Sequence, residues 1–382
     1  MGNNGRDPEK QVLVLQGGGA MGAYQAGAYE ALAAAGHSPE WVAGISIGAV
    51  NAAIIAGNPH KHCIERLRQF WNRVSSRLIF PPLSSDNVSR KIFNEASAAV
   101  VASTGAPGFF EPRVPPAVVM PPGTLEAIGL YDTSPLKATL LELVDFDQLN
   151  SGDIRFSVGA VQVCTGNMKY FDTGRGDKIR PEHIMASGAL PPGFPPVLID
   201  GEAYWDGGLV SNTPLQYVLD GSGHREDMCV FQLDLFSAKG PMPETLFDIG
   251  QREKDIRYSS RTRLNTDVFR RMQTMRRAIR RLERVLPDDY KSSLDWHVLS
   301  SVGCDAAVTI VHLIHRRAAY STQSNDYEFS RYTVDEHWRD GQDDVERTLR
   351  HPSWKNRERP KDGVTVLDLT KELDPQRPCR PA

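Results

Sequence analysis

The chain has 382 residues, of which 40% are hydrophobic and 24% are charged, and its formal net charge is -3 at pH 7. These values are typical of a globular protein and give no overall attraction to nucleic acid, so we expect no nucleic-acid partner. No apolar run reaches the roughly 18 residues of a membrane span, and the opening MGNNGRDPEK lacks the apolar core of a signal peptide. The 5 cysteines are scattered and show no metal-ligand spacing, which favours reduced thiols in a cytoplasmic protein.

Residues 11–57 predict two successive strand–turn–helix units. In the first, an apolar run of buried-strand type ends at three glycines, and a helical segment rich in Ala, Leu and Glu follows. In the second, a short apolar run leads into the turn Gly-Ile-Ser-Ile-Gly and an Ala-rich helical segment. The expected strands are 12–15 and 42–43, the expected turns are 17–19 and 44–48, and the expected helices are 20–35 and 49–56.

The second turn carries a candidate nucleophile, Ser46. A Gly-x-Ser-x-Gly turn between a strand and a helix lifts the serine hydroxyl out of the sheet on a strained corner. Gly44 and Gly48 flank the serine because a Cβ there would clash with neighbouring backbone. In the first turn, N–H groups at a helix N-terminus have no intrahelical acceptor, and Gly17–Gly19 would let them approach a developing oxyanion. The two turns together suit acyl transfer.

The first turn has a second interpretation, because Gly17-x-Gly19-x-x-Gly22 after a strand also fits a dinucleotide-binding loop. That interpretation requires an acidic residue at the end of the second strand, about 20 positions further on. Glu40 lies near that distance, but it precedes the strand. The serine turn occupies the place of the expected ribose contact, so the two motifs together favour a hydrolase.

Residues 79–129 form an insertion in which prolines alternate with aromatic and aliphatic residues. The proline content predicts that this stretch holds no long regular element. Its apolar content argues against disorder. Two interpretations remain: a cap or lid over Ser46 that offers apolar surface to a fatty or polyester substrate, or a packed insertion without substrate contact.

Hydrophobic patterning predicts further elements on both sides of this insertion. The expected helices are 60–77, 134–143, 181–188 and 212–219, and the expected strands are 154–163, 168–171, 197–199, 203–205 and 228–235. The strand 203–205 leads into Asp206-Gly207-Gly208, which taken alone is a turn. Because the chain holds a nucleophilic serine without a partner, Asp206 becomes a candidate base.

Three motifs therefore stand in one order: Gly17-Gly18-Gly19-Ala20-Met21-Gly22, Gly44-Ile45-Ser46-Ile47-Gly48 and Asp206-Gly207-Gly208. Together they closely resemble the patatin-like phospholipase family over residues 11–235. The resemblance implies a three-layer α/β/α sandwich with a mainly parallel sheet, and an acyl hydrolase with a Ser–Asp dyad and no catalytic histidine.

By position, the resemblance implies that Ser46 is the nucleophile and Asp206 the proton acceptor. It implies oxyanion donors in the backbone N–H groups of Gly18, Gly19 and Ala20. The glycines that support the motifs are Gly17, Gly22, Gly44, Gly48, Gly207 and Gly208. Many relatives have Arg or Lys where this chain has Met21, which removes a charged contribution near the oxyanion but leaves the backbone donors.

A Ser–Asp–His triad is an alternative to the dyad, because His224 follows Asp206 in the chain order of the α/β-hydrolases. The dyad scheme requires no metal and no cofactor. A carboxylate near its reference pKa of about 4 is a weak base for serine, so placement and partial desolvation of Asp206 must contribute. Esters or thioesters therefore suit this machinery better than amides.

Residues 236–382 are an expected C-terminal extension. Residues 251–286 carry many arginines and apolar residues at helical spacing, which predicts one basic amphipathic helix. This helix could dock on the core with a solvated arginine face, contact anionic lipid headgroups, or form a dimer surface. We further expect a strand at 305–314 that adds to the sheet, structural roles for His312 and His315, a polar helix at 332–348 and a mobile tail at 373–382.

The sequence thus predicts a cytoplasmic serine lipid acyl hydrolase of the phospholipase A or carboxylesterase type, able to bind membranes peripherally. Its catalytic domain is expected at 11–235 and the packed extension at 236–382. Two alternatives stay open: an esterase for hydroxyalkanoate oligomers, suggested by the apolar insertion, and a catalytically silent module that binds lipid or acyl groups.

Overall fold

The computed structural model describes residues 9–84, 86–221, 226–259, 262–316 and 321–370. In this part of the chain, one central sheet has nine strands in the order β11-β10-β9-β1-β2-β5-β8-β7, with β6 paired to β5. The neighbours from β11 to β5 run parallel, whereas β6 and β8 are antiparallel to β5, and β7 is antiparallel to β8. The strands are β1 Lys10–Leu15, β2 Trp41–Gly44, β5 Arg155–Gln162, β6 Met168–Asp172, β7 Val197–Ile199, β8 Glu202–Asp206, β9 Met228–Asp234, β10 Val308–Ile314 and β11 Val364–Leu367.

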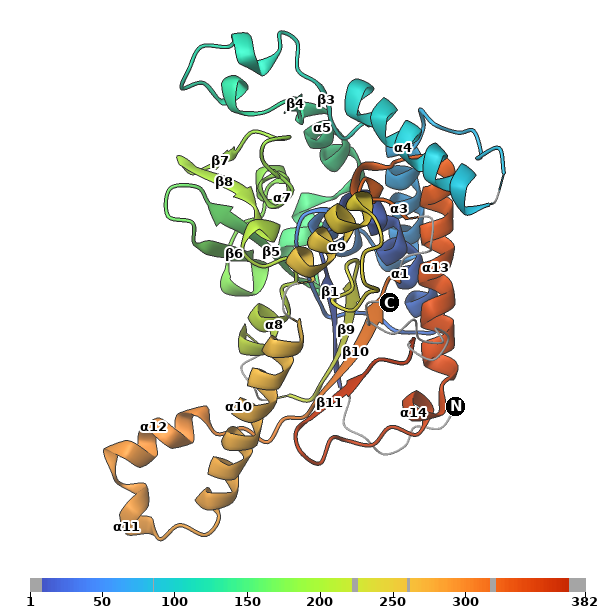
Figure 1. Ribbon diagram of the computed structural model, residues 1–382. Helices are drawn as coiled ribbons and strands as arrows, with labels where there is room; N and C mark the ends of the chain where they lie inside the picture. Colours follow the sequence, from blue (N-terminus) through green and yellow to red (C-terminus); the bar gives the residue numbers. More distant parts are fainter. Residues whose placement is uncertain (1–8, 85, 222–225, 260–261, 317–320, 371–382) are drawn as a thin grey trace.

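Helices cover both faces of this sheet, as the alternation along β1 shows. Leu13 and Leu15 pack in an apolar cluster with α1, α2, α3 and α13, whereas Val12 and Val14 pack on the other face with α8 and one residue of α10. The longer helices are α1 Ala23–Ala34, α2 Ile47–Ala56, α3 His60–Val74, α4 Asn87–Thr104, α5 Ser134–Leu143, α7 Pro181–Ser187, α8 Leu215–Gly221, α9 Leu246–Tyr258, α10 Thr262–Glu283, α12 Leu294–Val302 and α13 Arg331–Arg350. The predicted α/β fold with a mainly parallel sheet is confirmed (Figure 1).

Short elements complete the chain. These are the 3₁₀ turns η1 Gly19–Gly22, η2 Ala117–Val119, η3 Leu125–Ile128, η4 Thr173–Arg175, η5 Gly207–Leu209 and η6 Asn325–Tyr327, the helices α6 Phe146–Ser151, α11 Asp288–Lys291 and α14 Pro352–Lys355, and the paired strands β3 Glu111–Pro112 and β4 Tyr131–Asp132. None of the helices that the structure describes combines the length and the apolar character needed to cross a bilayer.

The prediction that the insertion holds no long regular element is wrong, because α4 extends over 18 residues. Its prolines lie before and after this helix, so the intervening segment keeps every backbone N–H that a helix needs. The Asp86 side chain accepts hydrogen bonds from the N–H groups of Val88 and Ser89 and caps the helix start. The proline-rich remainder forms the short turns η2 and η3 and the strand β3, which pairs with β4 just after the insertion.

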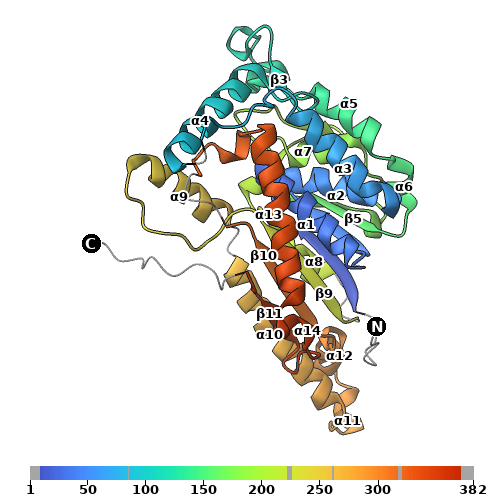
Figure 2. The same cartoon turned by 90° about the vertical axis from the view of Figure 1, so that its right-hand side faces the viewer.

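The C-terminal extension is built into the same body as the rest of the chain. β10 adds to the sheet, as expected; it pairs with β9 in parallel, and β11 continues the sheet. α13 lies along α1 at such close range that a Cβ on Gly27 would overlap the carbonyl oxygen of Trp338, and one on Gly341 would overlap that of Tyr24 (Figure 2). The predicted polar helix therefore has a buried face toward α1, and the extension cannot separate from the core without exposing it.

The single basic helix predicted at 251–286 is wrong, because two helices, α9 and α10, occupy this region. The first ends at Tyr258, whose carbonyl oxygen accepts hydrogen bonds from the side chains of Gln16, at 3.1 Å, and Asn212, at 3.0 Å. This carbonyl is therefore held by the core where a helix would continue. α10, α11 and α12 project from the body at the end opposite to α4 (Figures 1 and 2). The expected tail at 373–382 lies outside the described residues.

Candidate active site

The candidate nucleophile, Ser46, occupies a sharp turn between β2 and α2. Its φ of 55° is a strained, left-handed value for a residue with a Cβ. The Ser46 N–H donates to the Ser187 hydroxyl at 2.9 Å, and this hydroxyl in turn donates to the carbonyl oxygen of Gly159 on β5 at 2.6 Å. A Cβ on Gly48 would overlap the carbonyl oxygen of Leu15, so the helix start fits closely against β1.

Strand β5 brings the serine turn and the candidate base near each other. Gly44, two residues before Ser46, pairs with Val158 of β5, and Asp206 pairs with Ala160 of the same strand. Val158 and Ala160 are two positions apart on β5, so the residues that pair with them lie about 7 Å apart along this strand. The two turns therefore emerge side by side, although they are far apart in the sequence.

Asp206 is only 3% exposed. Burial raises its pKa to about 7, against the opposing effect of hydrogen bonds from the Gly208 N–H and the Ser46 hydroxyl. The Gly208 N–H donates to Oδ1 at 2.7 Å and fixes the orientation of the carboxyl group. The site thus holds a carboxyl group with a raised pKa beside a serine hydroxyl.

The glycine loop lies next to both side chains, since Gly17, Gly18 and Gly19 line the same cavity as Ser46 and Asp206. Gly19 has a φ of 56° and begins η1, which leads directly into α1. In the part of the chain that the structure describes, no backbone or side-chain acceptor takes a hydrogen bond from the N–H groups of Gly18, Gly19 or Ala20. These N–H groups at a helix start suit a bound anion.

Buried amide side chains that belong to none of the three sequence motifs hold this loop. The Gln16 side-chain oxygen accepts from the N–H groups of Leu235, at 2.6 Å, and Phe236, at 2.9 Å. Asn212 donates to the carbonyl oxygen of Gly17 at 2.9 Å, and the Gly17 N–H donates to the carbonyl oxygen of Asn212 at 3.1 Å. Gln16 could have been recognised, because an amide at the end of a buried strand needs partners.

The cavity has a volume of about 440 Å³ and is lined mainly by aromatic and aliphatic side chains. The insertion contributes Val101, Ala102, Phe109 and Phe110, so it contacts the cavity and is not packed away from it. The C-terminal extension contributes the wall that sequence reasoning missed: Phe236, Tyr258, Asp326, Tyr327 and Phe329. These aromatic residues carry no local motif, because only the fold brings them to the site.

The cavity-lining turn η6 is tied to α9 by Lys254. The Lys254 ammonium group lies 2.8 Å from a carboxylate oxygen of Asp326, donates to the carbonyl oxygen of Gln323 at 2.7 Å, and lies 5.4 Å from the Tyr327 ring centre. No histidine is among the described residues that line the cavity. His224 lies outside the described residues, so the triad alternative stays a hypothesis.

Comparison with known proteins identifies the family of the chain. A family model described as patatin-like phospholipase matches residues 13–219, which is more than half of the chain, and a second one described as patatin phospholipase matches residues 256–361. A search of curated proteins finds no match. Among solved structures, the crystal structure of VipD from Legionella pneumophila is similar over 86% of this chain and 67% of that chain, with 15% sequence identity and a TM-score of 0.32. The chain belongs to the patatin-like phospholipase family.

Proposed function

We propose that this chain is a serine lipid acyl hydrolase in which Ser46 is the nucleophile and Asp206 the proton acceptor. The observation that carries the proposal is the shared cavity: the hydroxyl, the buried carboxyl and the glycine loop all face one apolar space. A nucleophile, a base and a set of unused N–H donors are the parts that acyl transfer requires.

The reaction proceeds in two steps. The Ser46 oxygen attacks the ester carbonyl carbon while Asp206 takes the hydroxyl proton, and the oxyanion accepts hydrogen bonds from the N–H groups of the glycine loop. The carbon–oxygen ester bond breaks, Asp206 returns the proton to the leaving alkoxide, and an acyl-serine remains. In the second step water attacks the acyl-serine, Asp206 takes a proton from this water and returns it to Ser46, and the fatty acid leaves.

The pKa of Asp206 explains how a carboxylate can serve as the base. An unperturbed aspartate, with a pKa of about 4, is poorly matched to a hydroxyl at neutral pH. Burial raises the pKa of Asp206 to about 7, which is close to the working pH that favours general base catalysis.

The substrate class follows from the lining of the cavity. Its aromatic and aliphatic walls suit the hydrocarbon part of an acyl ester, and its volume lies within the range of small-molecule sites. We propose that the insertion is a cap that contacts the acyl chain through Val101 and Phe110. Outside the cavity it exposes Phe80, Leu83 and Val118, which would give this cap an apolar surface toward lipid.

Contact with an anionic membrane is a further part of the proposal. On the projecting α10, Met272 and Met275 are exposed among arginines, a pattern that suits anionic headgroups and also a second copy of the chain. In this proposal the enzyme is cytoplasmic and binds membranes peripherally. Sedimentation with liposomes that contain or lack anionic lipid, at low and high salt, tests the contact with anionic headgroups. Binding that depends on neither lipid charge nor salt concentration would contradict this contact.

Labelling with a fluorophosphonate probe tests the enzyme proposal directly. We expect stoichiometric labelling of the native chain and none of Ser46→Ala, with Ser211→Ala as a control that removes a nearby serine and keeps labelling. Labelling that persists in Ser46→Ala would point to another nucleophile. Absence of labelling in the native chain would indicate a catalytically silent acyl-binding module. Release of fatty acid from phospholipids, simple esters and hydroxyalkanoate oligomers then ranks the substrates.

A further inference from the structure

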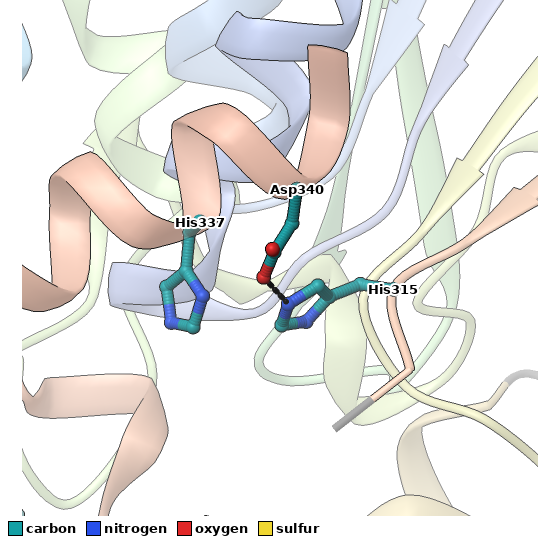
Figure 3. Close-up of side chains that lie close together, drawn as sticks. All are labelled: His315, His337 and Asp340. Carbon is teal, nitrogen blue, oxygen red and sulfur yellow. Dashed lines mark ion pairs between the residues drawn. The ribbon is translucent and has the colours of Figure 1, made fainter. Parts of the chain in front are cut away.

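A cluster of two imidazoles and a carboxylate lies outside the cavity, at the junction of β10 and α13. His315 directly follows the last residue of β10, and His337 and Asp340 lie three positions apart on α13, which puts both on one face of the helix (Figure 3). None of the three lines the candidate active site. The cluster therefore needs an explanation of its own.

The three side chains converge closely enough to share one ion. One ligand atom of each lies within 4.8 Å of those of the other two. His315 Nε2 lies 3.5 Å from Asp340 Oδ2, and the His315 and His337 ring centres are 4.7 Å apart. Bonds of about 2 Å in tetrahedral geometry place two ligand atoms roughly 3.3 Å apart. The His315–Asp340 pair is close to this spacing, and the ligand atom of His337 lies within 4.8 Å of both.

Burial and charge both favour a cation at this position. His315 is only 3% exposed, and its Nδ1 has no hydrogen-bond partner among the described residues. Its contact with Asp340 is too long for a strong hydrogen bond, so the Nε2 lone pair is available to a metal. The Asp340 side chain is 49% exposed, which gives an ion a path of entry and room for a water ligand. Asp344 interacts electrostatically with both His315 and Asp340.

We propose that His315, His337 and Asp340 bind one divalent transition-metal ion, with zinc as the preferred occupant. Two imidazoles and a carboxylate are a donor set that zinc takes with a water as fourth ligand, whereas calcium and magnesium prefer oxygen donors throughout. The ion would join the end of β10 to α13 and so hold this helix on the sheet.

The site also reaches the helix that starts at the glycine loop. The Tyr24 ring lies 4.9 Å from the His315 ring, and the Tyr24 hydroxyl donates to an Asp344 carboxylate oxygen at 2.9 Å. Tyr24 is the second residue of α1, directly after η1. An ion at His315 would therefore stiffen the packing behind the loop without touching the substrate. This inference stands on its own and does not depend on the proposed hydrolase activity.

The experiment uses the full chain, stripped with a chelator and dialysed into metal-free buffer. Titration with zinc, followed by calorimetry and by native mass spectrometry, is expected to show one ion per chain. The thermal midpoint should rise by a few degrees in excess zinc, because an ion that binds the folded state stabilises it. Replacement by cobalt(II) should give the strong visible absorption of a four-coordinate site.

Ligand variants and a matched control make the test decisive. Asp340→Asn and His337→Gln should each lower zinc affinity at least about tenfold and remove the thermal shift, while their midpoints in chelator stay near the native value. His62→Ala is the control, because His62 also lies near an acid, Glu65 at 3.7 Å, but is exposed on α3. Zinc binding that is unchanged in both ligand variants, or absent from the native chain, would overturn the proposal.

Discussion

The carbonyl oxygen of Asp326 packs directly against the α-carbon of Gly19, so that a Cβ on the glycine would overlap it. This contact joins the glycine loop near the start of the chain to η6 in the C-terminal extension. The same turn contributes Asp326 and Tyr327 to the cavity wall. The extension is therefore a structural part of the candidate site, and changes in either partner of this contact should affect both.

Gly19→Ala is expected to lower turnover of an ester substrate by about 100-fold or more. The substitution would strain a backbone with a φ of 56° and force the loop away from Asp326, which would move the oxyanion donors. Steady-state kinetics measures the effect. Gly36→Ala is the matched control, since Gly36 also has a positive φ, of 83°, but faces open space. The control should lose about 1 kcal/mol of stability and keep its turnover, and equal kinetic losses in both variants would contradict the role of this contact.

Lys254→Ala is expected to raise KM for long-chain esters about fivefold with little change in kcat. A fivefold change in KM corresponds to about 1 kcal/mol, the contribution of a partly exposed ion pair. The substitution frees Asp326 and the backbone at Gln323, so η6 becomes a less defined cavity wall. Lys291→Ala removes a comparable lysine–aspartate pair, at 3.1 Å from Asp288, on the projecting arm and serves as the control. A large fall in kcat for Lys254→Ala would show that η6 acts on the chemical step.

Local patterning predicted most of the sheet and its turns, because these depend on short-range features. The alternation of apolar runs with glycine turns in residues 11–57 is enough to predict β1, α1, β2 and α2. The prediction for the insertion is wrong for a related reason. Proline content averaged over 79–129 hides a proline-free segment that is long enough for α4.

The wall formed by the extension could not be predicted in this way. Phe236, Tyr258 and Phe329 lie in segments without any motif, and each reaches the cavity only because β9, α9 and α13 are placed by long-range packing. The break between α9 and α10 has the same origin, since the Tyr258 carbonyl is held by the side chains of Gln16 and Asn212. Hydrophobic period and helix propensity contain no information on such partners.

Val101→Trp is expected to shift the preference of the enzyme toward shorter acyl chains. Val101 lines the cavity from α4 and is 3% exposed, so a larger side chain would take up space that an acyl chain occupies. We expect the ratio of kcat/KM for long over short esters to fall about tenfold. Its neighbour Val100 is 39% exposed, and Val100→Trp should leave the ratio unchanged. An unaltered profile in Val101→Trp would mean that the acyl chain avoids the insertion.

The pH dependence of turnover tests the role of Asp206. Because the proposed base must be ionised, kcat/KM should rise about tenfold per pH unit below pH 7 and level off above it, following the pKa of about 7. A histidine at position 224 that acted as the base could produce a similar curve. His224→Ala should therefore keep both the rate and the curve, and Asp206→Asn should remove nearly all turnover. A rate without pH dependence between 5 and 8 would exclude this assignment.

The stability of Asp206→Asn supplies an independent test of the same pKa. Since the pKa in the folded state, about 7, lies above the unfolded value of 3.8, the folded chain keeps the Asp206 proton between these values and loses stability as pH rises through this window. Asparagine cannot ionise, so the stability of the variant relative to the native chain should increase between pH 5 and pH 8. The increase should be up to about 1.4 kcal/mol for each unit by which the pKa of Asp206 is raised within that interval. Urea unfolding at both pH values measures this gain.

Asp234→Asn is the control, because burial also raises the pKa of Asp234 to about 7, yet its side chain does not line the cavity. Both variants should gain stability at pH 8, and only Asp206→Asn should lose activity, which would separate the cost of a buried charge from its use as a base.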